Sequence, residues 1–272
     1  MSVHDRQLIG GPRKPSPVQG TLYQAHSSAR LVLAGVSIVM AALLIWASLI
    51  IWNGYATSSG TSWSFLPHTS RTPSTDLYFF VDEKEEVLSE PRLFAALLFT
   101  LAIQTFLTVG THCAELQVIL SRDEAIWRSI GTVKGSAPRL STFSSAVGTW
   151  QSAVLMCFKP LLHWIYGLAM FVDYTSGIYM FAPQITYLWS LWVLFMSFIW
   201  FVSCQSPTGY LPATYGHLKT MIDLVDEWHP RMFWGDKNTE LNGVRQAGTA
   251  ADKLLPIDPD ALYGGGHYQS YI

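Results

Sequence analysis

The sequence predicts an all-α integral membrane protein with four transmembrane helices, a cytosolic amphipathic helix and disordered tails. Half of the 272 residues are hydrophobic and only 13% are charged, against roughly a quarter charged in an average soluble domain. The apolar residues gather in segments long enough to cross the roughly 30 Å hydrocarbon core of a bilayer. An amphipathic segment follows the last of them, and polar sequence flanks the whole set.

Composition also excludes several classes of protein. The formal net charge is -2 and the basic residues are scattered singly, so no basic stripe predicts nucleic-acid binding. The three cysteines, Cys113, Cys157 and Cys204, lie in or beside apolar runs and form no C-x-x-C pair. They predict neither a disulfide framework nor a zinc site.

The chain begins with a polar segment, 1–30, whose GGPRKPSP stretch cannot nucleate a helix. We expect a disordered cytosolic tail there. Residues 31–52 are free of charge and, at 1.5 Å per residue, exceed the roughly 30 Å of hydrocarbon, so they predict the first transmembrane helix. A cleaved signal peptide is disfavoured because its apolar core would be about 7 to 15 residues long and nearer the N-terminus.

The middle of the chain alternates between polar and apolar segments. Residues 53–92 form a Ser/Thr-rich and acidic loop, expected on the extracytosolic side, and 93–114 form a second uncharged span. The stretch LQVILSRDEAIWRSI keeps helical periodicity while becoming amphipathic. Residues 115–148 are therefore predicted as a cytosolic loop that carries an amphipathic helix.

The third span lies within residues 150–181, and the sequence allows two registers. A helix from Trp150 to Val172 places Lys159 near mid-membrane and the following proline inside the helix. A helix from Leu161 to Phe181 places that proline in the first turn, where its missing N–H costs nothing, but it leaves Asp173 in the bilayer. Each register buries one ionisable group, and both stay open at this stage.

The C-terminal third contains the fourth span and a second amphipathic segment. Residues 184–204 form the clearest apolar run. In 212–229 apolar and acidic residues recur on opposite faces at helical spacing, which predicts a cytosolic helix whose apolar face packs on protein. Residues 238–272 are polar and Gly-rich and are expected to be a disordered cytosolic tail.

Orientation follows from the basic residues in the connections. The N-terminal segment, the 115–148 loop and the C-terminal segment carry most of them, whereas the 53–92 loop is mostly acidic. The positive-inside rule then predicts that both termini are cytosolic, in the plasma membrane or an endomembrane. Four crossings return the chain to its starting side, so span count and charge agree.

Two predicted spans carry polar residues at helical spacing. The stripe on the second span consists of Gln104, Thr108, Thr111 and Glu115, and that on the third consists of Lys159, His163, Tyr166 and Asp173. Ionisable groups in lipid face the bundle interior or a water-filled cavity, so the stripes should point at each other or at the remaining spans. They are either a solute or proton path or the hydrogen bonds that hold a bundle together.

The segment YGHLKTMIDLVDEWHPRMFWGDK is rich in charged and aromatic residues, but it does not predict a metal or catalytic site. His217 and Asp223 are six residues apart and point to different sides of a helix. No nucleophile, base and orienting group converge by spacing. We therefore assign no catalytic, cofactor-binding or metal-binding residues and expect no cofactor and no enzyme activity.

The KPLLHW stretch, the YGHLKTMIDLVDEW block and the FWGDK that follows it resemble uncharacterised fungal multi-span membrane proteins. The resemblance covers residues 159 to 237. It implies relatedness only and carries no activity and no site residues.

Together these patterns predict a multi-pass membrane protein with a structural or scaffolding role. Its partners would be the lipid bilayer and proteins at the cytosolic face, without nucleic acid. The alternative is a small-solute or ion transporter or channel that uses the polar stripes of the second and third spans.

Overall fold

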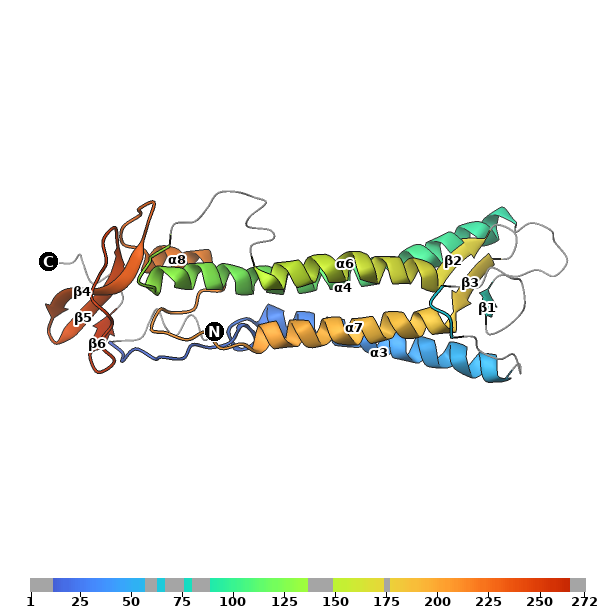
Figure 1. The fold of residues 1–272 in the computed structure, drawn as a ribbon, viewed down its shortest axis with the longest axis horizontal. Coiled ribbons are helices and arrows are strands. Elements are labelled where there is room, and N and C mark those ends of the chain that lie inside the picture. Colours follow the sequence, from blue (N-terminus) through green and yellow to red (C-terminus); the bar gives the residue numbers. More distant parts are fainter. Residues whose placement is uncertain are drawn as a thin grey trace. The chain divides into compact units, whose positions relative to one another are not determined.

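The computed structural model describes residues 12–56, 63–66, 76–79, 89–136, 149–173 and 177–264. It is mostly helical, and four helices are long and apolar enough to cross a membrane, as the sequence predicted. These four helices are α3 (Ser27–Ala56), α4 (Glu90–Arg128), α6 (Trp150–Ala169) and α7 (Ala182–Cys204) (Figure 1). The helix that begins in the second span continues without a break through the amphipathic stretch to Arg128.

The four helices leave large apolar side chains exposed along their length. Examples are Ile38 on α3, Phe94 and Phe106 on α4, and Leu194 on α7. A water-soluble protein rarely exposes apolar surface so continuously, whereas helices in contact with lipid have no reason to bury it.

The expectation of an all-α protein is wrong, because the described residues also contain two three-stranded sheets. The first has the order β1-β3-β2 and is antiparallel throughout. Its strands are β1 (Asp76–Phe79), β2 (Met170–Asp173) and β3 (Gly177–Phe181). Strand β1 precedes α4, whereas β2 and β3 join α6 to α7 (Figure 1), so this sheet ties together two connections that are distant in sequence.

This sheet also decides the register of the third span. Helix α6 begins at Trp150 and ends at Ala169, with Pro160 inside it. The alternative from Leu161 to Phe181 is wrong, because backbone pairing with β3 takes over from Met170 onward. Asp173 therefore lies on a strand and not on the helix.

The second sheet consists of β4 (Phe233–Leu241), β5 (Val244–Ala250) and β6 (Leu262–Gly264), with β4 antiparallel and β6 parallel to β5. The predicted disorder of 238–272 is thus wrong up to Gly264, and residues 265–272 lie outside the described chain. Asn242 and Gly243 join β4 to β5 with φ of 54° and 77°. An Asn-Gly pair with positive φ at both residues is the preferred two-residue hairpin turn, because its twist matches that of the strands.

The predicted helix over 212–229 is reduced to the seven residues of α8 (Leu218–Leu224). The chain before it adopts left-handed conformations at Tyr215 and Gly216, with φ of 43° and 74°. After it, the amides of Asp226 and Glu227 donate to the Thr249 hydroxyl. Tertiary hydrogen bonds have therefore replaced helical ones at both ends.

The described part of the N-terminal segment is ordered, contrary to the prediction for 1–30. Helix α2 (Leu22–Ala25) starts with a capping box between Thr21 and Gln24, in which two otherwise unsatisfied amides are satisfied reciprocally. Residues 1–11 lie outside the described chain. So do most of the predicted 53–92 loop and residues 137–148 of the predicted cytosolic loop.

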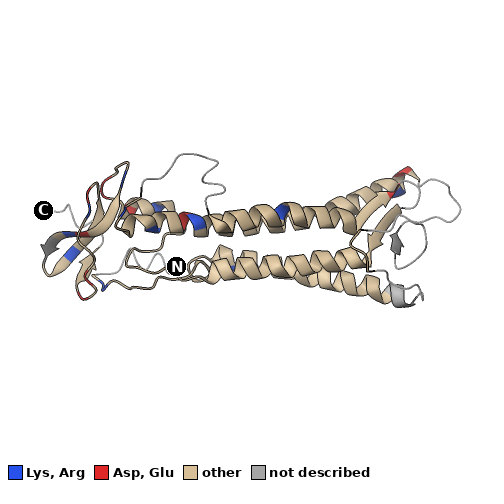
Figure 2. Ribbon diagram, in the orientation of Figure 1, with Lys and Arg blue, Asp and Glu red and all other residues tan. Residues whose placement is uncertain are grey.

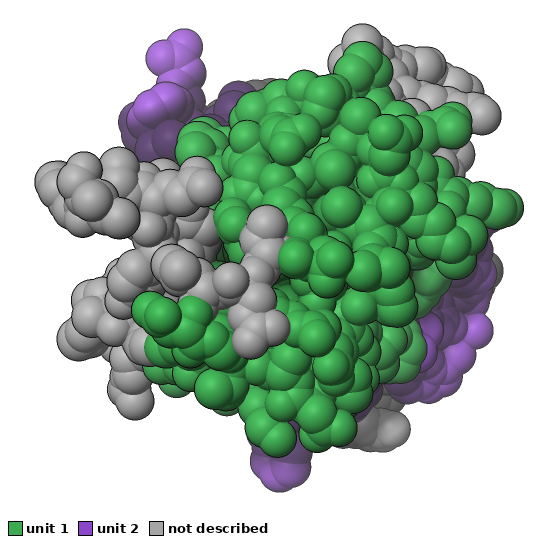
Figure 3. Space-filling model, turned by 90° about the vertical axis from the view of Figure 1, so that its left-hand side faces the viewer, with its two compact units in different colours: residues 1–30, 116–153, 201–272 green, residues 31–115, 154–200 purple. Residues whose placement is uncertain are grey.

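The chain divides into two compact units (Figure 3). Unit 1 comprises residues 1–30, 116–153 and 201–272, and unit 2 comprises residues 31–115 and 154–200. Unit 1 contains the second sheet, and unit 2 contains the first sheet with the central parts of the four apolar helices.

Candidate functional site

Unit 1 is organised around a buried carboxylate on α4. The side chain of Glu124 is 3% exposed. Its Oε2 accepts from the backbone amides of Thr214 and Tyr215, each at 2.8 Å, and from the Thr214 hydroxyl at 3.2 Å. Its Oε1 accepts from Arg128 Nη1 at 3.0 Å. A buried charge is tolerated when it is paired and its lone pairs are filled, and Glu124 meets both conditions.

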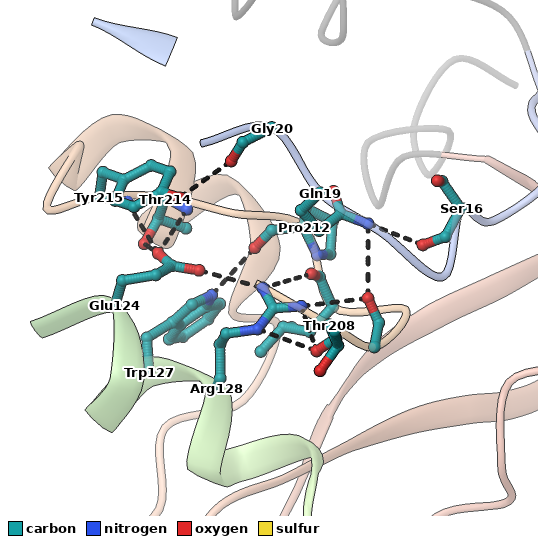
Figure 4. Close-up of polar contacts among 12 residues, drawn as sticks. Ser16, Gln19, Gly20, Glu124, Trp127, Arg128, Thr208, Pro212, Thr214 and Tyr215 are labelled. Atoms are coloured by element: carbon teal, nitrogen blue, oxygen red, sulfur yellow. Dashed lines mark hydrogen bonds and ion pairs between the residues drawn. The ribbon is translucent and has the colours of Figure 1, made fainter. Parts of the chain in front are cut away.

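One turn further along α4, Arg128 completes the network (Figure 4). Its guanidinium donates to the carbonyl oxygens of Thr208, Gly209 and Leu211. Trp127 Nε1 donates to the Pro212 carbonyl at 3.2 Å. The last turns of α4 thus hold the chain that follows α7 through its backbone, which explains how a segment without a helix or strand stays fixed.

The N-terminal segment joins the same network. The Gly209 amide donates to the Pro17 carbonyl at 2.8 Å, and the Gln19 amide donates to the Pro207 carbonyl at 3.0 Å. Tyr215 Oη donates to the Gly20 carbonyl at 2.9 Å (Figure 4). Three stretches that are far apart in sequence therefore form one structure.

A polar contact among helix ends adds to this unit. Gln117 Nε2 donates to the Ala29 carbonyl at 3.0 Å, and its Oε1 accepts from the Ser203 hydroxyl. All the side chains involved are buried. Helices α3, α4 and α7 are thereby joined where each enters unit 1.

Burial shifts two ionisable groups beside the network. It raises the pKa of Tyr215 far above its ordinary range, and the nearby Glu124 carboxylate acts in the same direction. Burial also lowers the pKa of His26, with a smaller effect from His217. Tyr215 stays protonated and His26 tends toward its neutral form at neutral pH, so the tyrosine hydroxyl remains a donor to Gly20.

The sheet of unit 1 contains a second buried carboxylate, Asp236. Its Oδ2 accepts from Tyr263 Oη at 2.7 Å and from Arg245 Nη1 at 3.1 Å, and its Oδ1 accepts from the Asn238 amide at 2.7 Å. Burial alone would raise the pKa of Asp236, but these hydrogen bonds outweigh it and hold the pKa below its ordinary value. The carboxylate connects β4, β5 and β6.

In unit 2 the structure brings together one residue from each predicted polar stripe. Lys159 Nζ on α6 lies 2.7 Å from Glu115 Oε2 on α4, and His112 Nδ1 lies 3.2 Å from the same oxygen. Figure 2 shows how few charged residues interrupt these helices. The ion pair therefore links α4 to α6.

The other stripe residues mostly satisfy backbone groups. Tyr166 Oη on α6 donates to the Thr100 carbonyl on α4 at 2.8 Å. The hydroxyls of Thr108 and Thr111 donate to carbonyls of their own helix. Such bonds commonly satisfy a hydroxyl within an apolar helix.

The remaining three stripe residues also lie outside the charged pair. Gln104 is exposed on α4, and His163 is half-buried on α6. Asp173 is on β2, so the third-span stripe ends before it. The stripes meet at Glu115 and Lys159 without forming a continuous row of ionisable groups.

The sequence did not predict the buried charged residues around which the polar contacts of unit 1 are arranged. Glu124 and Arg128 occupy i and i+4 of a periodic helix, which indicates an ordinary surface pair. Nothing local to α4 indicates that backbone some 85 residues later covers them. Asp236 lies in the FWGDK stretch, for which the sequence predicted no strand.

Within the described chain, no group of three or more His, Cys, Asp or Glu side chains is arranged to hold a metal ion. His217 instead caps α8, because its side chain accepts from the Thr220 amide. Comparison with family models, curated proteins and solved structures gave no match.

Proposed function

We propose that this protein is a membrane-anchored interaction protein, in which the four apolar helices anchor unit 1 and unit 1 binds a protein partner. One observation carries the proposal. Four crossings leave three segments on one side of a bilayer: the chain before the first helix, the chain between the second and third, and the chain after the fourth. Unit 1 is assembled from these three segments.

The pairing of β1 with β3 supports the same topology. It joins the connection between the first two helices to the connection between the last two, which four crossings leave together on the opposite side. The positive-inside rule assigns unit 1 to the cytosol, because it holds most of the basic residues. Both chain ends would then be cytosolic, in the plasma membrane or an endomembrane.

The polar groups of unit 1 favour binding over chemistry. The hydrogen bonds of Glu124, Arg128 and Asp236 are made with backbone groups and neighbouring side chains within the unit. A catalytic group instead needs a reactive atom open to a substrate. This hydrogen-bonding pattern is that of a scaffold.

The surface of unit 1 offers an apolar contact on and beside α8. Val225, directly after α8, packs in a cluster with Trp127, Ile130 and Leu211. Leu218 and Ile222, one turn apart, remain 66% and 52% exposed. Apolar side chains in such positions are typical of protein contacts.

Affinity purification from detergent-solubilised membranes tests this proposal. The double variant Leu218→Asp/Ile222→Asp should lose partners that the wild type retains, because two charges would have to be buried at the contact. The matched control Ala251→Asp adds a charge at an exposed position of the same unit and should retain them. Identical partner sets for all three proteins, at equal folded yield, would overturn the proposal.

The alternative function, transport of a small solute or ion, is supported by the Glu115–Lys159 pair within the spans. Ionisable residues in such positions often mark transport paths. Flux into proteoliposomes that disappears in Lys159→Gln would establish this alternative. Under the interaction proposal, wild type and variant both show only the leak of empty liposomes.

A further inference from the structure

A short segment of the connection between α3 and α4, residues Trp63 to Leu66, packs against two of the apolar helices. The Phe65 ring lies 5.6 Å from the Trp164 ring on α6 and 6.0 Å from the Tyr187 ring on α7, measured between ring centres. The Trp63 ring lies 6.5 Å from the same tyrosine. These are ordinary distances for interacting aromatic rings.

A buried amide fixes the segment through its backbone. Gln184, in the first turn of α7, is 2% exposed. Its Nε2 donates to the carbonyls of Ser64 at 3.1 Å and Phe65 at 3.2 Å. Leaving a buried amide N–H without a partner is costly, so these two bonds give the segment a definite position on α7.

The depth of the contact follows from helix geometry. Trp164 lies five residues before the end of α6 at Ala169, and Tyr187 lies five residues after the start of α7 at Ala182. Five residues correspond to about 7.5 Å along a helix axis. The 20 residues of α6 correspond to about 30 Å, the thickness of the hydrocarbon core. The aromatic contacts therefore fall near the boundary between acyl chains and headgroups.

The outer surface of this segment is apolar and uncovered. Trp63, Phe65 and Leu66 are each more than half exposed, and Trp164 beside them is half exposed. Trp164, whose ring contacts Phe65, is itself one of the exposed apolar side chains of α6. Trp and Tyr concentrate at membrane interfaces because their rings are apolar while one edge forms hydrogen bonds.

We propose that Trp63 to Leu66 is an interfacial anchor that inserts into the lipid headgroup–acyl boundary and holds the connection between α3 and α4 against the bilayer. Lipid is the partner because the exposed aromatic segment packs on Trp164, an exposed apolar side chain of one of the helices proposed to cross the bilayer. The inference rests on the proposed membrane insertion of the four helices. It adds a lipid contact outside unit 1.

Spin labels in proteoliposomes test the proposal. The three native cysteines are replaced by alanine, and a nitroxide is attached at Leu66→Cys or, separately, at Trp63→Cys. Collisions with oxygen, which concentrates in lipid, are compared with collisions with a water-soluble nickel chelate. Two control labels accompany them: Leu194→Cys on the exposed face of α7 and Ala251→Cys in unit 1.

The labels at residues 63 and 66 should have oxygen-to-nickel ratios between the two controls and clearly on the lipid side of Ala251→Cys. A ratio equal to that of Ala251→Cys would overturn the anchor. Exclusion of both reagents would also overturn it, because protein, such as a second copy of the chain, would then cover the segment. A water-like ratio at Leu194→Cys would instead overturn the membrane insertion itself, so the two failures are distinguishable.

Discussion

Two of the ion pairs on helix α4 have sharply different surroundings. Glu124 and Arg128, in unit 1, are 3% and 14% exposed and share their remaining hydrogen bonds with backbone groups. Glu115 and Lys159, in unit 2, are 31% and 24% exposed, and His112 Nδ1 lies 3.2 Å from the Glu115 oxygen that Lys159 contacts. The first pair organises a fold, whereas the second links two helices.

The difference shows that charge has two uses in this chain. Where the backbone is irregular and lacks helical or sheet hydrogen bonds, a buried ion pair can satisfy backbone amides and carbonyls that would otherwise need water as their partner. Within the spans the backbone is already satisfied by the helices, so a charged pair contributes only its own attraction.

The largest effect is expected from Glu124→Ala. It leaves Arg128 and the amides of Thr214 and Tyr215 without their partner in a buried site. Removing one member of a buried pair costs about 3 to 5 kcal/mol, so the variant should melt at a much lower temperature in detergent and yield less folded protein. A melting curve that matches wild type would contradict the central role of Glu124 in unit 1.

Two glycines provide the next comparison. A Cβ at Gly235 in β4 would overlap the Leu255 carbonyl oxygen, which is rigid backbone, whereas a Cβ at Gly110 in α4 would lie 3.2 Å from the Trp192 ring. Gly235→Ala should destabilise unit 1 by about 1 to 3 kcal/mol, as overpacking does. Gly110→Ala should cost less, because the ring needs to shift only slightly. Unfolding in detergent measures both, and the reverse order would contradict this account.

A smaller effect is expected from the pair in the spans. In a double-mutant cycle of Glu115→Gln and Lys159→Met, the coupling energy should be about 0.6 kcal/mol and at most about 1.7 kcal/mol, the mean and the maximum measured for polar contacts between membrane helices. Each single variant should be less stable than wild type, and the double variant should lose less than their sum. A coupling near zero would mean that the two side chains act independently.

The smallest effect concerns pH. The pKa of Asp236 in the folded protein lies below its unfolded value, so its contribution to stability is present at neutral pH and is lost as the pH falls below about 4. Wild type should therefore lose more stability between pH 6 and pH 3 than Asp236→Asn. Equal slopes for the two proteins would show that Asp236 is not held as a carboxylate by its partners.

Local pattern was enough to predict the spans and insufficient for unit 1. Residues 31–52 could be assigned because an uncharged run of that length has few other solutions. In contrast, the segment 212–229 has good helical periodicity but forms only α8, because Thr214 and Tyr215 donate their amides to Glu124 instead. The Asn242–Gly243 turn was the one local signal that could have predicted the second sheet.

The candidate site shows the same limit. The sequence identified Glu115 and Lys159 as members of facing stripes, because lipid excludes charge and forces it inward. It misplaced Asp173, since a helix was extended through residues that pair as a strand.

By itself the sequence determined the number of apolar helices, because a long uncharged segment depends on its own composition and not on its neighbours. Only the tertiary structure decided where helices end and strands begin, and which carboxylates organise unit 1. Those choices depend on hydrogen bonds between residues up to about 200 positions apart, such as Tyr215 with Gly20. Local periodicity contains no information on such partners.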